Sequence, residues 1–238
     1  MSKTASGDLP IIGDPLSLGL PAKFSRPQDF DAPQVRLIHA AEALFAEQSI
    51  ESVSLREIAK AAGNGNNNAV QYHFGGKNGL VQAIFAYRVW QMDEARRIGW
   101  ERLKAIGRST DIPSLLELLY LPLLDLANDV RRHTYSSFIV KYLLLSRPTG
   151  LPHPIDSLNE TTVALRQITS AIGAQLAHFP DDLVINRITT ASLMFNTMLV
   201  RSDNDGVTEK GGKPFRKRVN DCLEMINAAL RAPATKFG

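Results

Sequence analysis

Apolar residues recur at spacings of three and four between residues 34 and 48, which is the period of an amphipathic helix. The apolar stripe consists of Leu37, Ile38, Ala41, Leu44 and Phe45. Asp31 provides an acidic cap, Pro33 is an early proline, and Gln34 stands three positions after the cap, as at many helix starts. The pattern therefore predicts a first helix that begins at about residue 31, ends at about residue 48 and buries one face.

Two short helices separated by a tight turn are predicted next. Ser54 and Glu57 form a capping-box pattern, in which each side chain accepts a hydrogen bond from the backbone of the other residue. Gly63 supplies the left-handed conformation in which such a helix ends. Residues 69–74 then form a third short helix, which the glycine pair at 75–76 ends. Together the three helices have the geometry of a helix-turn-helix that places a recognition helix in the DNA major groove.

The rest of the chain is predicted to be helical. A long helix over residues 77–106 connects two domains, and prolines or a polar, glycine-containing loop separate the later segments. These segments span 113–128, 130–146, 156–178, 181–202 and 214–231. We find no alternating strand pattern and no internal repeat. The predicted fold class is all-α: a flexible arm (1–30), a three-helix helix-turn-helix domain (31–80), and a larger helical domain for ligand binding and dimerisation (81–238).

Composition is that of an ordinary globular protein with room for two cores. The chain has 238 residues, of which 44% are hydrophobic and 21% charged. Its single cysteine, Cys222, excludes an intrachain disulfide framework and a cysteine-based zinc cluster, and it fits a reducing cytoplasm. We expect no signal peptide, no membrane segment, no metal and no cofactor.

The charge distribution limits how the predicted domain could attract DNA. The whole chain has a net charge of +3, but residues 33–80 contain four basic and four acidic residues. Attraction to phosphate must therefore come from a few placed cations, from helix amino termini and from backbone donors. In the proline-containing arm, Lys23 and Arg26 could contact a DNA backbone, although the arm is also explained as a disordered terminus.

The start of the third short helix is rich in side-chain amides. Such groups donate and accept at the same time, which suits the edge of an adenine. The candidate residues are Asn66, Asn67, Asn68 and Gln71. Asparagine also tolerates left-handed backbone and forms Asx turns, and for Asn64 we favour that structural explanation.

Three segments resemble the tetracycline-repressor (TetR/AcrR) family of transcription regulators. They are LIHAAEALFAE at 37–47, SLREIAKAAG at 54–63 and YHFGGK at 72–77. The resemblance covers about 48 residues with several fixed spacings. It implies an all-helical homodimer whose amino-terminal domains bind a palindromic DNA operator, and whose carboxy-terminal domain binds a small effector that releases the DNA. Repression is the commoner mode in that family.

The resemblance also implies roles for individual residues in DNA binding. Arg56 matches a DNA-contacting position near the start of the second helix, and Lys77 matches a lysine that meets phosphate. Asn67 and Asn68 match base-facing positions, whereas Tyr72 and His73 match backbone-contacting positions. Ser54, the cap of the second helix, completes the candidate set. Arg56 could instead be a solvated surface residue, and His73 a buried, hydrogen-bonded histidine.

The chain departs from the family pattern in three places. Ser49 replaces a usual helix-ending glycine. One extra residue lies between Gly63 and Phe74, so the assignment of Asn66, Asn67 and Asn68 could slip by one position. Gln71 replaces a usual tyrosine, and it could contact a base or a phosphate.

The larger domain contains a candidate dimer interface and a candidate effector pocket. The adjacent, amphipathic segments 156–178 and 181–202 could bury their apolar stripes inside their own domain, but the resemblance favours a homodimer through them. Aromatic, polarisable and titratable residues suit a pocket for a largely apolar effector, although each could be an ordinary core residue. These residues are Tyr120, His133, Tyr135, Phe138, Tyr142, Met194 and Phe195.

Two other classes of protein are less favoured. Enzymes are disfavoured, because we find no HExxH pair, no glycine-flanked serine, no phosphate loop and no cysteine cluster. A fold relative that binds a ligand or protein partner without sequence-specific DNA binding stays open, because residues 33–80 carry no net charge. The favoured function is a cytoplasmic, ligand-responsive transcription regulator, with a repressor preferred to an activator.

Overall fold

A computed structural model describes residues 30–127, 132–153, 163–207 and 212–234, and these segments contain only helices and connecting turns. The predicted all-α fold class is therefore confirmed. The α-helices are α1 (Ala32–Glu47), α2 (Leu55–Ala61), α3 (Ala69–Phe74), α4 (Lys77–Ala105), α5 (Ile112–Tyr120), α6 (Thr134–Lys141), α7 (Val163–Gln175), α8 (Asp181–Asn204) and α9 (Lys213–Arg231). A 3₁₀ helix, η2 (Leu121–Leu126), follows α5, and a π-helical turn, η3 (Tyr142–Ser146), follows α6.

The amino-terminal helices form as their local sequence dictates. The Asp31 carboxylate accepts a hydrogen bond from the backbone N–H of Gln34 at 2.8 Å, and the Gln34 side chain accepts one from the backbone N–H of Asp31 at 2.9 Å. Leu37, Ile38 and Phe45 of α1 are fully buried in the core that α2 and α3 close. The predicted start and buried stripe of the first helix are confirmed.

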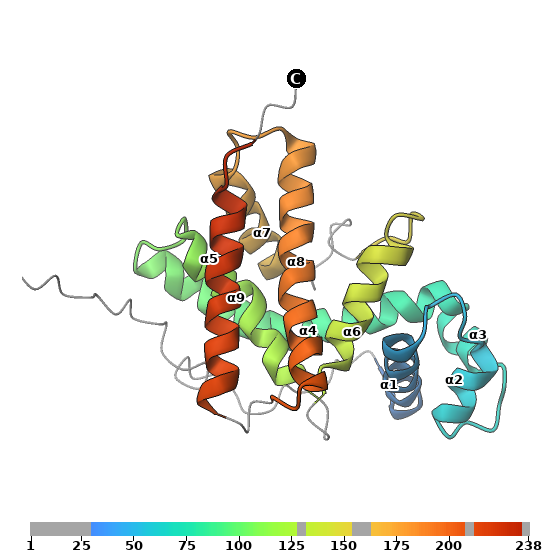
Figure 1. The fold of residues 1–238 in the computed structure, drawn as a ribbon. Helices are drawn as coiled ribbons and strands as arrows, with labels where there is room; N and C mark the ends of the chain where they lie inside the picture. The colour runs from blue at the N-terminus through green and yellow to red at the C-terminus, as the bar shows by residue number, and fades with distance from the viewer. Residues whose placement is uncertain (1–29, 128–131, 154–162, 208–211, 235–238) are drawn as a thin grey trace, which may run out of the picture.

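Helix α4 connects the two halves of the molecule. Figure 1 shows α1, α2 and α3 at one end of α4, and α5, α7, α8 and α9 towards its other end. Helix α6 packs closely against α1, so the larger domain also touches the amino-terminal unit directly. At Gly99, α4 approaches α5 so closely that a Cβ would overlap a methyl group of Leu118. Position 99 therefore requires glycine or a displaced leucine side chain.

Two of the predicted carboxy-terminal helices differ in detail from the structure. The segment predicted over 113–128 is α-helical only to Tyr120, and the chain continues as η2 because Pro122 has no N–H to donate to an α-helical hydrogen bond. The segment predicted over 130–146 is α-helical from Thr134 and ends in the π-helical turn. For the segment predicted over 156–178, residues 156–162 lie outside the described part of the chain. Residues 1–29 of the predicted arm, including Lys23 and Arg26, also lie outside it.

Candidate DNA-binding face and effector cavity

The turn between α2 and α3 is closed by a Schellman motif. The backbone N–H of Asn64 donates to the carbonyl of Ala59 at 2.9 Å, and the N–H of Gly63 donates to the carbonyl of Lys60 at 3.0 Å. Gly63 has a φ of 66°, the left-handed conformation that favours glycine. The predicted stop of the second helix is confirmed, and the chain is redirected towards α3.

Two successive Asx turns then lead into α3. The side-chain oxygen of Asn64 accepts from the backbone N–H of Asn66, and that of Asn66 accepts from the N–H of Asn68, both at 2.9 Å. Helix α3 begins at Ala69, so Asn68 is its N-cap position and Asn66 and Asn67 precede it. The oxygens of Asn64 and Asn66 are thus used within the turn, which leaves their NH₂ groups as donors.

Three other amides are available to a partner. Asn67, Asn68 and Gln71 are exposed, and none makes a side-chain hydrogen bond to the described part of the chain. Each amide offers a donor and an acceptor side by side, which is the pattern that an adenine edge complements.

Helix α2 carries two cations that share a groove with Asn67. Arg56 and Lys60 are exposed and lie four residues apart on one face of α2, where they line a shallow groove with Asn67. The structure therefore brings together Arg56 and Asn67, which were predicted as DNA contacts, and adds Lys60. The spacing of Lys60 from Arg56 is a sequence signal that could have identified it.

Glu57, the acidic residue in the same groove, is held in the capping box. Its carboxylate accepts from the backbone N–H of Ser54 at 2.7 Å, and its own N–H donates to the Ser54 Oγ at 3.2 Å. The hydrogen bond with the Ser54 side chain is the main cause that lowers the pKa of Glu57, with the backbone of Ser54 next. The Ser54 side chain is exposed, but its hydroxyl is engaged with Glu57 within the capping box.

The other predicted DNA contacts lie at the far end of α3. Tyr72 is 82% exposed and packs edge-to-face on the half-buried His73, with 5.0 Å between their ring centroids. Lys77, the first residue of α4, donates from Nζ to the carbonyl oxygen of Glu51 at 2.9 Å. An ammonium has three donors, so Lys77 can bind the turn between α1 and α2 through Glu51 and still donate to a phosphate.

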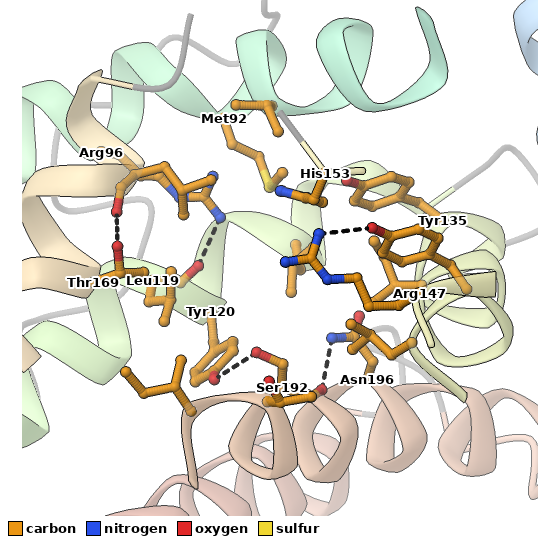
Figure 2. Close-up of a pocket in the computed structure, with 18 residues that line it drawn as sticks. Met92, Arg96, Leu119, Tyr120, Tyr135, Arg147, His153, Thr169, Ser192 and Asn196 are labelled. Carbon is orange, nitrogen blue, oxygen red and sulfur yellow. Dashed lines mark hydrogen bonds between the residues drawn. The ribbon is translucent and has the colours of Figure 1, made fainter. Parts of the chain in front are cut away.

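The larger domain contains a cavity of about 190 Å³ between α4, α5, α6, α7 and α8 (Figure 2). Three of the predicted pocket residues, Tyr120, Tyr135 and Tyr142, line it. Tyr120 shares a 3.2 Å hydrogen bond with Ser192, and burial raises the pKa of both Tyr120 and Tyr135. These phenols are therefore neutral at physiological pH and can donate to a ligand.

The other four predicted pocket residues lie elsewhere. His133 is buried and pairs with Asp203 through Nδ1 at 2.9 Å. Phe138 is a core residue, and Phe195 stacks behind Tyr120 with 4.8 Å between ring centroids. Met194 lines a different groove, between α8 and α9.

Several cavity residues were missed by sequence reasoning. The polar ones are Arg96, Arg147, His153, Thr169, Thr189, Ser192 and Asn196. A signal did exist for Arg96, because it continues the buried stripe of α4 through Val89, Met92 and Gly99. A charged residue on a buried stripe is unusual and points to a special environment.

A buried polar cluster joins the cavity domain to the amino-terminal unit. Arg88 of α4 donates to both carboxylate oxygens of Glu42 in α1, at 2.6 and 2.8 Å, and the Thr134 hydroxyl of α6 donates to Glu42 at 2.7 Å. Desolvation acts to lower the pKa of Arg88, but the charge and hydrogen bonds of Glu42 outweigh it and raise that pKa. Three helices from both halves of the molecule thus meet at one carboxylate.

An aromatic chain runs beside this polar cluster. Tyr142, which lines the cavity, contacts Phe85 at 4.7 Å between ring centroids, and Phe85 contacts Phe138 at 5.1 Å. Phe138 stacks on Phe45 of α1 at 6.2 Å. The wall of the cavity therefore reaches the core of the amino-terminal unit through packed rings.

These features define an all-helical protein with an amino-terminal helix-turn-helix domain and a larger domain that contains a cavity. Residues 37–84 match the family model described as "Bacterial regulatory proteins, tetR family". The match lies within the amino-terminal domain, which is therefore similar to the DNA-binding domain of this family of transcription regulators.

Solved structures of other proteins also resemble the chain. No curated protein matches the chain. A solved structure described as "Molecular basis for control of antibiotic production by a bacterial hormones" covers 84% of this chain and 97% of its own, with 17% sequence identity and a TM-score of 0.45.

Proposed function

We propose that this protein is a ligand-responsive transcription regulator that binds a palindromic operator as a dimer, represses from it, and is released by a small effector. The observation that carries the proposal is a set of exposed amides on a helix-turn-helix similar to that of the tetR family. The amides of Asn67, Asn68 and Gln71 make no side-chain hydrogen bond to the described part of the chain. The cavity and its packed connection to α1 support the effector response.

The first experiment is to measure binding to DNA from around the protein's own gene, because regulators of this family often act on neighbouring genes. We expect saturable, salt-sensitive binding to a palindrome. Binding that ignores sequence, or no binding, would favour the alternative of a fold relative that recognises a ligand or partner without reading DNA.

Arg56→Ala and Lys77→Ala should each weaken operator binding. Loss of a contact to a guanine edge should weaken the binding free energy by about 1 to 3 kcal/mol. Loss of a phosphate contact should reduce, by about one, the slope of the logarithm of the binding constant against the logarithm of the salt concentration. Fluorescence anisotropy across a salt series measures both.

Arg97→Ala is the matched control for these variants. Arg97 is exposed on α4 and pairs with Glu94, so its loss changes the net charge equally without touching the proposed DNA face. Operator binding that survived both Arg56→Ala and Lys77→Ala would contradict the assignment of this face.

The dimer is proposed to form through the outer faces of α8 and α9. Helix α7 was included in the predicted interface, but it packs against α4 and α5 in its own domain. Helix α8 is long and apolar enough to cross a membrane by length and composition, but a single helix of this kind is weak evidence for a membrane span. Only 22% of its most apolar stretch is buried within the chain. Ile185 of α8 and Met225 of α9 are 66% and 54% exposed. Such an apolar face is expected where a second copy covers it.

Met225→Glu should dissociate the dimer. The side chain is exposed in the single chain, so the fold should tolerate the change, whereas an unpaired carboxylate in the interface should weaken association by about tenfold or more. Sedimentation over a concentration series measures this change.

Leu144→Glu serves as its control, because Leu144 is similarly exposed, at 57%, but lies on η3. An unchanged dimer in Met225→Glu, or equal weakening in Leu144→Glu, would argue against the α8–α9 interface. Two recognition helices about one DNA turn apart, roughly 34 to 36 Å, would follow from the dimer.

A further inference from the structure

Arg96 is a buried cation on the wall of the effector cavity. It is 3% exposed, and its Nη2 donates to the backbone carbonyl of Leu119 at 2.8 Å. Its Nε and Nη1 have no hydrogen-bond partner among the described residues. Buried guanidinium groups are normally paired, because an unsatisfied buried donor loses its hydration without compensation. Two unused donor positions on one buried side chain therefore call for an external acceptor.

The charge of Arg96 is also left without a direct counterion. Burial lowers the pKa of Arg96 to about 10, so the guanidinium stays charged at neutral pH. Asp93, one turn earlier on α4, is the acidic residue that acts on it, but no carboxylate of the described residues forms an ion pair with Arg96. The cavity wall thus presents a positive charge that makes no direct ion pair with a carboxylate of the described residues.

The remainder of the described cavity lining contains no aspartate or glutamate. Arg147 also lines the cavity and donates to the Tyr142 hydroxyl at 3.2 Å. Figure 2 shows the side chains of Arg96 and Arg147 extending into the central space from opposite walls. Between them the walls are apolar, with Val89, Met92 and Leu123 among the lining residues.

We propose that the effector is a small organic carboxylate, whose carboxylate group pairs with Arg96 and whose apolar body fills the rest of the cavity. A guanidinium matches a carboxylate in charge, planarity and donor spacing. The proposal rests on the proposed function, since it names the chemical class of the molecule that the cavity takes.

The volume of the cavity sets the size of this ligand. An engineered apolar cavity of about 150 Å³ accommodates benzene. A cavity of about 190 Å³ therefore has room for one aromatic ring or a short branched chain together with a carboxylate. Benzoate has this size and charge, and benzamide is its neutral counterpart of nearly the same shape.

The test is to titrate the full-length protein with benzoate and with benzamide by calorimetry at neutral pH, with thermal unfolding as a second readout. We expect benzoate to bind and stabilise the protein, and benzamide to bind about tenfold to a hundredfold more weakly. Arg96→Met should remove this preference. The ligand-free variant should be at least as stable as the natural protein, because methionine needs no partner in a buried site.

Arg97→Met is the matched control. This variant replaces the neighbouring residue and lowers the net charge by the same amount. Because Arg97 is exposed and paired with Glu94, the preference for benzoate should persist. The proposal is overturned if benzoate fails to bind, if benzamide binds equally well, or if Arg96→Met retains the preference.

Operator binding, measured separately, distinguishes the two proposals. If a neutral molecule releases the operator while benzoate does not bind, the proposed function stands and the carboxylate assignment falls. If benzoate binds through Arg96 while the protein recognises no operator, the carboxylate assignment stands and the proposed function falls.

Discussion

Gly79→Ala is expected to destabilise the amino-terminal domain, although alanine is normally the better helix residue. In an ordinary helix interior, replacing glycine with alanine stabilises by about 0.5–1 kcal/mol. At position 79, however, the added Cβ would overlap the backbone carbonyl oxygen of Phe74. Because this carbonyl belongs to the last residue of α3, the methyl group can be accommodated only by moving the recognition helix.

The close approach follows from the turn between α3 and α4. Gly75 and Gly76 have φ values of 69° and 120°, which let the chain reverse within two residues and bring Phe74 against the third residue of α4. We expect Gly79→Ala to lower the free energy of unfolding by about 1–3 kcal/mol, as overpacking does in other close-packed sites. Operator affinity should fall as well, because α3 carries the exposed amides. Urea unfolding followed by circular dichroism, and operator anisotropy, measure the two effects.

Gly65→Ala is the control for this variant. Gly65 lies in the turn before α3, its φ is not left-handed, and a Cβ added there would meet no atom within 4 Å. Its replacement should therefore leave stability unchanged or raise it by up to about 1 kcal/mol, because alanine lowers the conformational entropy of the unfolded chain. A Gly79→Ala protein as stable as Gly65→Ala would show that the α3–α4 turn relaxes freely.

Sequence reasoning was most successful where hydrogen bonds are local. The capping boxes at Asp31 and Ser54 and the stop at Gly63 each depend on partners within five residues, and all three are present in the structure. The same reasoning predicted that the Asn64 side chain would form an Asx turn. What it could not give was the second Asx turn, in which Asn66 uses its oxygen internally, because the extra residue in the turn changes the register.

The cavity in the larger domain was harder to predict because it is assembled from five helices. Tyr120, Tyr135 and Tyr142 line it, but Met194 faces the groove between α8 and α9 instead. A helical pattern shows that a face is apolar without showing which neighbour covers it. Arg96 was overlooked for the same reason, since its burial depends on α5, more than 20 residues later in the chain, whose Leu119 carbonyl accepts its hydrogen bond.

Glu42→Leu is expected to have the largest effect on global stability. Glu42 and Arg88 have side-chain exposures of only 2% and 11%, so removal of the carboxylate leaves a buried guanidinium without its counterion. Breaking a buried pair in this way costs about 3–5 kcal/mol. The Thr134 hydroxyl would lose its acceptor at the same time, which loosens α6 from α1. Urea unfolding gives the loss in free energy.

The double variant Glu42→Leu with Arg88→Met separates the charge from the packing. If Glu42→Leu destabilises the protein mainly by leaving the buried Arg88 guanidinium unpaired, removing Arg88 as well should restore most of the stability. The changes in unfolding free energy of the two substitutions should then be strongly non-additive. Glu94→Leu is the exposed counterpart, because Glu94 and Arg97 are about half exposed, and its cost should stay below about 1 kcal/mol. A double variant as unstable as Glu42→Leu alone would mean that Glu42 acts through Thr134 and the shape of the α1–α6 contact, and not through its charge.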